Sequence, residues 1–132
     1  MKISCFVFIC VLLSSCIDHK GSFIEKGSIE LNNANNEISV SVGKQLYFNI
    51  KEHQSVGYKS KVQIQDTSVL ALERSIFKYK NPPKRGLVPA GGDRGIRTYY
   101  FRAKSQGVSS VQIQSMFHGE KESATKYTIE VR

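Results

Sequence analysis

The stretch that decides the fold is Tyr127-Thr128-Ile129-Glu130-Val131, in which apolar and polar side chains alternate. A period of two places one set of side chains in a core and the other in water, as in a β-strand. The same alternation recurs at residues 37–42, 46–50, 62–65 and 111–114, and no long stretch has helical periodicity. The chain is therefore predicted to be all-β.

Turn signals rich in Asn, Gly, Asp and Ser separate these strands. They lie at 32–36, 43–44, 66–68 and 105–107. About seven short strands with regular turns predict an immunoglobulin-like β-sandwich. The longest irregular stretch is 78–94, and a loop of that length in a compact domain is usually functional or disordered.

The N-terminus has the three parts of a secretory signal peptide. Lys2 supplies a positive charge, and residues 3–13 are an uncharged stretch too short to span a hydrocarbon core of about 30 Å. Leu13-Ser14-Ser15-Cys16 then matches a lipobox. We expect residues 1–15 to be removed and Cys16 to be diacylated, the alternative being an ordinary secretory signal in which Cys16 is incidental.

The mature chain divides into a tether and one domain. Residues 16–27 are polar and punctuated by glycine, as in a flexible linker. Residues 28–132 are expected to form the β-sandwich. Cys5 and Cys10 lie in the signal peptide, so no disulfide can form within the mature chain. A chain of this size buries about two-thirds of its unfolded surface, which is enough for one domain.

The lipid anchor implies a location in the cell envelope. Ile17, not Asp, follows Cys16, so inner-membrane retention is not signalled and an outer-membrane anchor is expected. The chain is basic, with a formal net charge of +8. An exported basic domain suits an acidic protein, anionic lipid or polysaccharide, and we expect no nucleic acid partner.

Catalytic and metal-binding patterns are absent from the sequence. His19, His53 and His118 have no metal-ligand spacing and are expected to be exposed loop residues. The serines form no nucleophile elbow, and no P-loop Lys-Ser/Thr pair follows Gly91-Gly92. No carboxylate stands out as buried. The sequence therefore predicts a protein that is not an enzyme and that needs no cofactor or metal.

The C-terminal half resembles the chagasin-type inhibitors of papain-like cysteine proteases. The resemblance rests on Leu87-Val88-Pro89-Ala90-Gly91-Gly92, a strand ending at residues 101–104, Gly107 and residues 111–113. The closing strand 127–131 and the turn 42–46 extend it to about residues 28–132. That family has an Ig-like sandwich and inhibits with three loops at one end of it.

The loop tips match the family less well than the frame. The first loop, usually Asn-Pro-Thr-Thr-Gly-aromatic, corresponds to residues 53–58, His-Gln-Ser-Val-Gly-Tyr. The second, Gly-x-Gly-Gly, has lost its first Gly at Pro89, and the third, usually Arg-Pro-Trp, corresponds to residues 117–119, Phe-His-Gly. The resemblance implies these protease-binding residues: Ser55, Val56, Gly57, Tyr58, Ala90, Gly91, Gly92, Phe117 and His118.

The resemblance implies a monomeric, membrane-anchored, reversible inhibitor whose partner is a papain-like cysteine protease. Val56 would contact the protease beside its catalytic centre, and Phe117 would replace the missing Trp. Each feature also has a structural interpretation: Gly57 and Gly91-Gly92 would serve tight turns, and Phe117 would pack on the sandwich end. The alternative function is an Ig-like envelope lipoprotein that binds carbohydrate or another envelope protein without inhibiting a protease.

Overall fold

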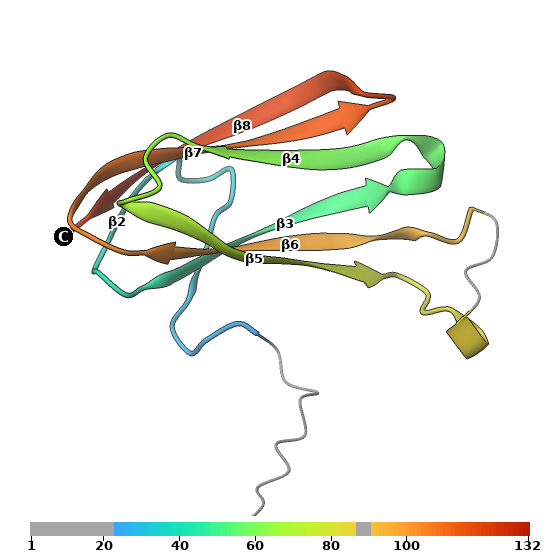
Figure 1. The fold of residues 1–132 in the computed structure, drawn as a ribbon, viewed down its shortest axis with the longest axis horizontal. Helices are drawn as coiled ribbons and strands as arrows, with labels where there is room; N and C mark the ends of the chain where they lie inside the picture. The colour runs from blue at the N-terminus through green and yellow to red at the C-terminus, as the bar shows by residue number, and fades with distance from the viewer. Residues whose placement is uncertain (1–22, 87–90) are drawn as a thin grey trace, which may run out of the picture.

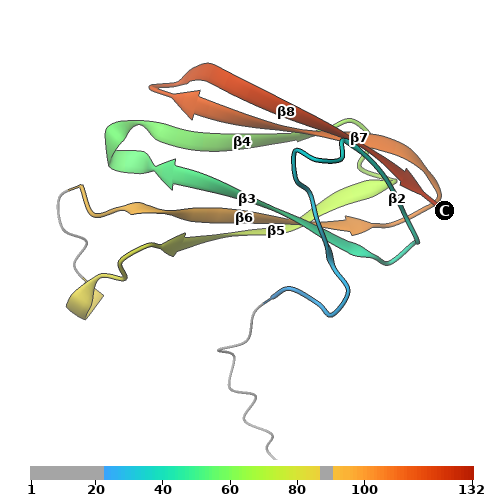
Figure 2. The same ribbon diagram turned by 180° about the vertical axis from the view of Figure 1, so that it is seen from behind.

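The computed structural model describes residues 23–86 and 91–132, and they form an all-β domain (Figures 1 and 2). The strands are β1 (Ile29–Glu30), β2 (Glu37–Val40), β3 (Gln45–His53), β4 (Tyr58–Ile64), β5 (Leu70–Tyr79), β6 (Arg94–Ala103), β7 (Gly107–Phe117) and β8 (Glu120–Val131). Two 3₁₀ turns lie between strands: η1 (Gln54–Val56) between β3 and β4, and η2 (Lys84–Gly86) between β5 and β6.

The strands form two layers joined at one hairpin. Hydrogen bonding follows the order β2-β8-β7-β4-β3-β6-β5, with β1 paired to β3. The β3–β4 step has a single registered pair, His53 with Tyr58, at the hairpin itself. Beyond that pair β3 and β4 separate, so β4, β7 and β8 lie in one layer and β3, β6 and β5 in the other (Figure 1). The predicted β-sandwich is therefore observed, with the short β1 added to seven longer strands.

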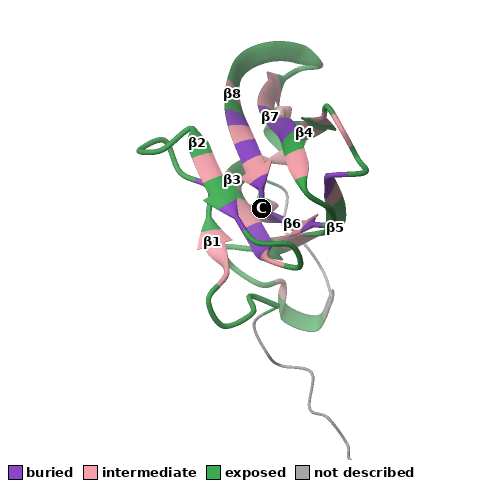
Figure 3. Cartoon of the chain, turned by 90° about the vertical axis from the view of Figure 1, so that its left-hand side faces the viewer, coloured by how far each residue is buried: buried purple, intermediate pink, exposed green. Residues whose placement is uncertain are grey.

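Alternate side chains of the two layers fill the core between them, as the sequence pattern predicts. Tyr127 and Ile129 of β8 are fully buried, and Val131 is 3% exposed. Figure 3 shows the resulting alternation of buried and intermediate positions along the C-terminal half of β8. The opposite layer contributes Leu46 and Phe101, both fully buried. Burial of such side chains stabilises a fold by about 1.5–3 kcal/mol each.

The predicted strands correspond to β2, β3, β4, β7 and β8, although β2 ends at Val40 and β4 at Ile64, before the predicted ends at residues 42 and 65. The predicted turns lie at the ends of strands. The sequence does not predict β5, because its apolar and polar side chains do not alternate regularly. Its pairing with β6 shifts register between Leu72 and Arg74, a bulge that changes which side chains face the core.

Residues 23–27, the end of the expected tether, contact the sandwich. Glu25 pairs with Arg102 of β6 at 2.5 Å, and its backbone N–H donates to Gln45 at 3.0 Å. The Arg102 guanidinium holds the pKa of Glu25 below its usual range. The Phe23 ring lies 4.9 Å from the guanidinium carbon of Arg74. The expected signal peptide and Cys16 lie outside the described residues.

Within residues 23–86 and 91–132, no helix has the length and apolar character needed to cross a membrane. The described parts of three connections lie at one end of the sandwich: 54–57 between β3 and β4, 80–86 and 91–93 between β5 and β6, and 118–119 between β7 and β8 (Figure 1). We call this end the loop end.

Candidate functional site

The first connection of the loop end is a closed turn. Residues 54–56 form the 3₁₀ turn η1, and the N–H of Gly57 donates to the carbonyl of Gln54 at 3.0 Å. Gly57 has φ +96°, in the left-handed region that side chains with a Cβ rarely adopt. Ser55 and Val56 are exposed, Val56 at 43%. The turn therefore presents a small polar and a small apolar side chain to solvent.

The third connection is a two-residue hairpin turn between β7 and β8. His118 and Gly119 have φ +49° and +87°, the pair of positive values that defines a type I′ turn. Histidine is one of the few residues other than glycine that enter this region readily. Phe117 at the end of β7 is 37% exposed.

The first and third connections pack against each other. The N–H of His118 donates to the carbonyl of Gly57 at 3.1 Å. A Cβ on Gly57 would lie 2.9 Å from Nδ1 of His118. Beside them, the rings of Tyr58 and Phe117 lie 4.6 Å apart and are paired across β4 and β7. Gly57 thus serves both the turn and the close approach of a neighbouring loop.

The second connection is bonded to the first through Asp93 and His53. One carboxylate oxygen of Asp93 accepts the backbone N–H of Ser55 at 2.5 Å, and the other accepts its hydroxyl at 2.5 Å. These bonds hold the pKa of Asp93 below its usual range. His53 Nε2 lies 3.0 Å from the carbonyl of Gly91 and 3.3 Å from the Asp93 carboxylate.

A buried carboxylate supports the first connection from below. Glu52 is 3% exposed and accepts the Nε–H of Arg97 at 2.9 Å. It also accepts the backbone N–H of Ser60 at 2.9 Å, together with the Ser60 hydroxyl. That hydroxyl lies 2.7 Å from the hydroxyl of Tyr99, whose pKa is raised by burial. The network joins β3, β4 and β6 directly beneath η1.

The structure gathers most of the predicted site residues at the loop end. Ser55, Val56 and Gly57 lie in the first connection, and Tyr58 begins β4 directly after it. Gly57 contacts His118 of the third connection, and Tyr58 contacts Phe117 at the end of β7. The structural interpretation of Phe117 is confirmed in part, because its ring packs on Tyr58 while remaining partly exposed.

The second connection is described only in part. Gly91 is exposed with φ +72°, and Gly92 is half-buried just before Asp93. Ala90 lies outside the described residues. Whether these residues bind a protease stays a prediction.

One histidine prediction was wrong. His53 is the last residue of β3, half-buried and bonded to Gly91, because the hairpin turns its ring toward the second connection. His118 is exposed in a turn, as predicted, and His19 lies outside the described residues.

Sequence reasoning missed Glu52, Asp93 and Arg97. The sequence does contain a sign that Glu52 is buried, because Glu52 continues the inward phase of Leu46, Phe48 and Ile50. A carboxylate at such a position needs a buried partner. The described residues contain no group of three or more His, Cys, Asp or Glu that could hold a metal ion.

Comparison with solved structures shows the same fold. A cysteine protease inhibitor of Entamoeba histolytica, EhICP2, matches with a TM-score of 0.63 at 14% identity, covering 80% of this chain and 96% of that one. The solution structure of Amebosin matches with a TM-score of 0.56 at 13% identity, covering 80% and 98%. No curated protein sequence matches.

The family comparison covers most of the sandwich. The model of the chagasin family of peptidase inhibitors, I42, matches residues 39–131, which include strands β3 to β8, the end of β2 and all three connections of the loop end. The family is one of inhibitors, not of enzymes. The chain therefore belongs to the chagasin family of peptidase inhibitors.

Proposed function

We propose that the domain reversibly inhibits papain-like cysteine proteases by wedging the loop end into the active-site cleft. The observation that carries this proposal is the bonding among the three connections, through Ser55–Asp93, His53–Gly91 and Gly57–His118. Loops that are already ordered lose little conformational entropy when they bind. The family assignment and the inhibitor fold support the same function.

The shape of the first connection explains why such an inhibitor would resist cleavage. A protease cleft holds its substrate as an extended chain beside the nucleophile. Residues 54–56 are instead coiled into η1 and closed by the hydrogen bond from Gly57 to Gln54. The turn can occupy the cleft without presenting a peptide bond in the geometry that the nucleophile attacks.

Two partly exposed apolar side chains, one in this turn and one beside the third connection, would contact the protease. Val56 lies at the tip of the first connection, and Phe117 lies beside the third. Aromatic anchors commonly supply much of the binding energy at a protein interface. The ring contact between Phe117 and Tyr58 fixes the Phe117 side chain before binding. We assign Phe117 the place that the family gives to a tryptophan.

The lipobox at Leu13–Cys16 supports a membrane-anchored inhibitor. A diacylated Cys16 would hold the domain at the cell envelope, and we propose the outer membrane. Tethering raises the effective concentration of an inhibitor near the membrane. A protease that reaches the envelope would therefore meet the inhibitor there.

The test is a titration of residues 22–132 against papain and a cathepsin-type protease with a fluorogenic peptide substrate. The buried apolar core lies between Leu31 and Val131, so this part keeps the whole core. We expect reversible loss of protease activity at or below micromolar inhibitor. A folded domain that leaves both proteases fully active at that concentration would overturn the proposal and favour the envelope-binding alternative.

A further inference from the structure

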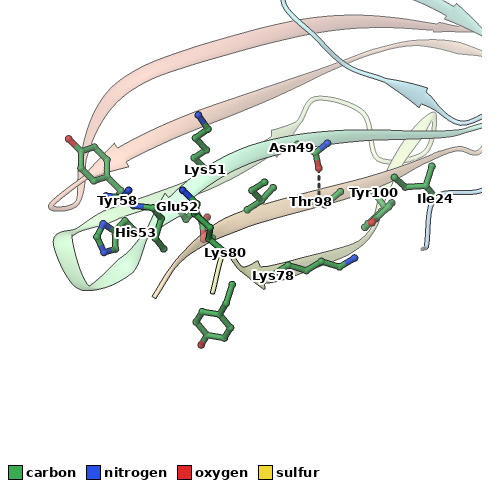
Figure 4. A pocket seen from close by; sticks show the side chains of 14 residues that line it. Ile24, Asn49, Lys51, Glu52, His53, Tyr58, Lys78, Lys80, Thr98 and Tyr100 are labelled. Carbon is green, nitrogen blue, oxygen red and sulfur yellow. Dashed lines mark hydrogen bonds between the residues drawn. The ribbon is translucent and has the colours of Figure 1, made fainter. Parts of the chain in front are cut away.

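A basic groove lies on the sheet face that is turned away from the core. Phe48 and Ile50 of β3 pack on the core, so the alternate side chains of Asn49 and Lys51 face outward. The groove has a volume of about 800 Å³ and extends over β3, β6 and β5 (Figure 4). Its lining residues include His53 and Tyr58 at one end and Ile24 at the other.

The groove combines an apolar floor with a cationic rim. Its floor includes Ile96 at 46% exposed, Tyr79 at 37% and Ile24 at 39%. Four exposed cationic side chains lie along its rim: Lys51, Lys78, Lys80 and Arg94.

The rim cations lack acidic partners within the described part of the chain. None of the four forms an ion pair there. Arg97 and Arg102, which lie on β6 with Arg94, do form ion pairs. Glu52, the one acidic residue among those that line the groove, has a buried side chain that is paired with Arg97. At the far end Glu30 is bonded to Asn49 at 3.0 Å. The rim is therefore strongly positive and its charge is not neutralised within the described fold.

We propose that this groove docks the domain on a bilayer surface that contains anionic phospholipids. Clustered lysines beside exposed apolar side chains suit the boundary between phosphate headgroups and acyl chains. Phosphate and glycerol-phosphate groups would meet the rim, and Ile96 and Ile24 would meet the acyl boundary. The proposal does not depend on protease inhibition.

The position of the N-terminus favours a bilayer over an acidic protein as the occupant. The described chain begins at Phe23 beside the groove, because Ile24 lines it. Cys16 precedes Phe23 by only seven residues, which span at most about 25 Å when fully extended. With the lipid on Cys16 that we propose, the groove would be held within that distance of the headgroups. The two proposed protease anchors, Val56 and Phe117, do not line the groove, whereas His53 and Tyr58 border it at the loop end.

The test is co-sedimentation of residues 22–132, without the lipid, with phospholipid vesicles. One set contains phosphatidylcholine alone and the other about 30% phosphatidylglycerol. We expect binding to the anionic set only, and release at about 0.5 M NaCl, where exposed charges are screened. Binding to neither set, or equally to both, would overturn the proposal.

A matched pair of variants locates the binding surface. Lys51 and Lys78 changed to Gln should weaken vesicle binding at least about tenfold. Lys61 and Lys126, exposed on β4 and β8 of the other layer, changed to Gln make the same change in charge, and we expect less than about a twofold effect. Equal losses in both variants would show that net charge alone acts and would overturn the proposal.

Both variants are also titrated against papain. Retained inhibition with lost vesicle binding supports a separate membrane surface. Lost inhibition with unchanged vesicle binding would identify the groove as a contact for an acidic protease surface and overturn the membrane proposal. If the unaltered domain binds anionic vesicles but inhibits no protease, the proposed inhibition fails and the membrane surface stands.

Discussion

A Cβ on Gly57 would lie 2.9 Å from Nδ1 of His118, closer than real Cβ atoms approach another heavy atom. The two residues come from different hairpins, and the N–H of His118 also donates to the carbonyl of Gly57. The absence of a side chain at position 57 is therefore what lets the first and third connections form one surface.

The first prediction concerns Gly57→Ala. Ala at φ +96° costs about 1–2 kcal/mol of backbone strain, and the contact with His118 adds to it. We expect the His118 hairpin to move and inhibition of papain to weaken at least about tenfold. The measurements are the inhibition constant and the free energy of unfolding in urea.

Gly43→Ala is the control for backbone strain. Gly43 has φ +84°, and its added Cβ would meet nothing within 4 Å. It precedes β3 at the end of the sandwich away from the loops. We expect a similar strain cost without a change in inhibition. Equal weakening by both variants would remove the Gly57–His118 contact from the mechanism.

The second prediction concerns the link between Ser55 and Asp93. The lowered pKa of Asp93 means that the carboxylate and its bonds are present above the ordinary aspartate value of 3.8. The link is lost only as the pH falls through the lower pKa of the folded state. It is therefore expected to persist through the mildly acidic range.

The measurement is the NMR shift of the Ser55 amide followed against pH. We expect its midpoint below 3.8 in the unaltered domain and closer to that value in Ser55→Ala, which removes the hydroxyl donor. A midpoint above 3.8, or one that Ser55→Ala leaves in place, would contradict the assigned cause.

The segments that the sequence predicts, such as 46–50 in β3 and 127–131 in β8, have apolar side chains at their inward positions. In β8, residues 127, 129 and 131 follow one phase without exception. In β5 the bulge between Leu72 and Arg74 changes the phase, and Leu72 is left 45% exposed. Alternation cannot mark a strand whose phase changes midway.

The sequence predicts which residues lie at the tips of the loops, but not the hydrogen bonds and ion pairs that connect the loops. The resemblance to chagasin-type inhibitors places residues 55–58 and 117–118 from motif spacing alone. Ser55 and Asp93 are 38 residues apart, and their bond depends on the pairing of β3 with β6, which sets His53 opposite Arg94. Glu25 likewise meets Arg102 across 77 residues, so the end of the tether resembled a linker in the sequence.

The third prediction concerns the lipid anchor. Cys16→Ser removes the thiol that the lipobox pattern assigns to diacylation. We expect the full chain to move from the membrane fraction to the soluble fraction of expressing cells, with no diacylglycerol mass on the N-terminal peptide. Cys10→Ser, inside the expected signal peptide, should leave both observations unchanged. A lipid-free N-terminus in the unaltered protein would contradict the anchor.

The fourth prediction concerns Glu52, the buried carboxylate beneath the first connection. Glu52→Ala would leave Arg97 and the Ser60 N–H without their acceptor. Removing one partner of a buried ion pair costs about 3–5 kcal/mol, and we expect about 2–4 kcal/mol here because the Arg97 side chain is 21% exposed. The measurement is urea unfolding.

Glu122→Ala is the comparison for Glu52→Ala. Glu122 is exposed on β8, where it accepts one hydrogen bond from Ser115 at 3.2 Å. An exposed substitution of this kind changes stability by about 0.5 kcal/mol or less. Because the Glu52 network joins β3, β4 and β6 beneath η1, Glu52→Ala should also weaken papain inhibition at temperatures where the domain stays folded. Unchanged inhibition in a destabilised but folded variant would show that the network stabilises the sandwich without ordering the first connection.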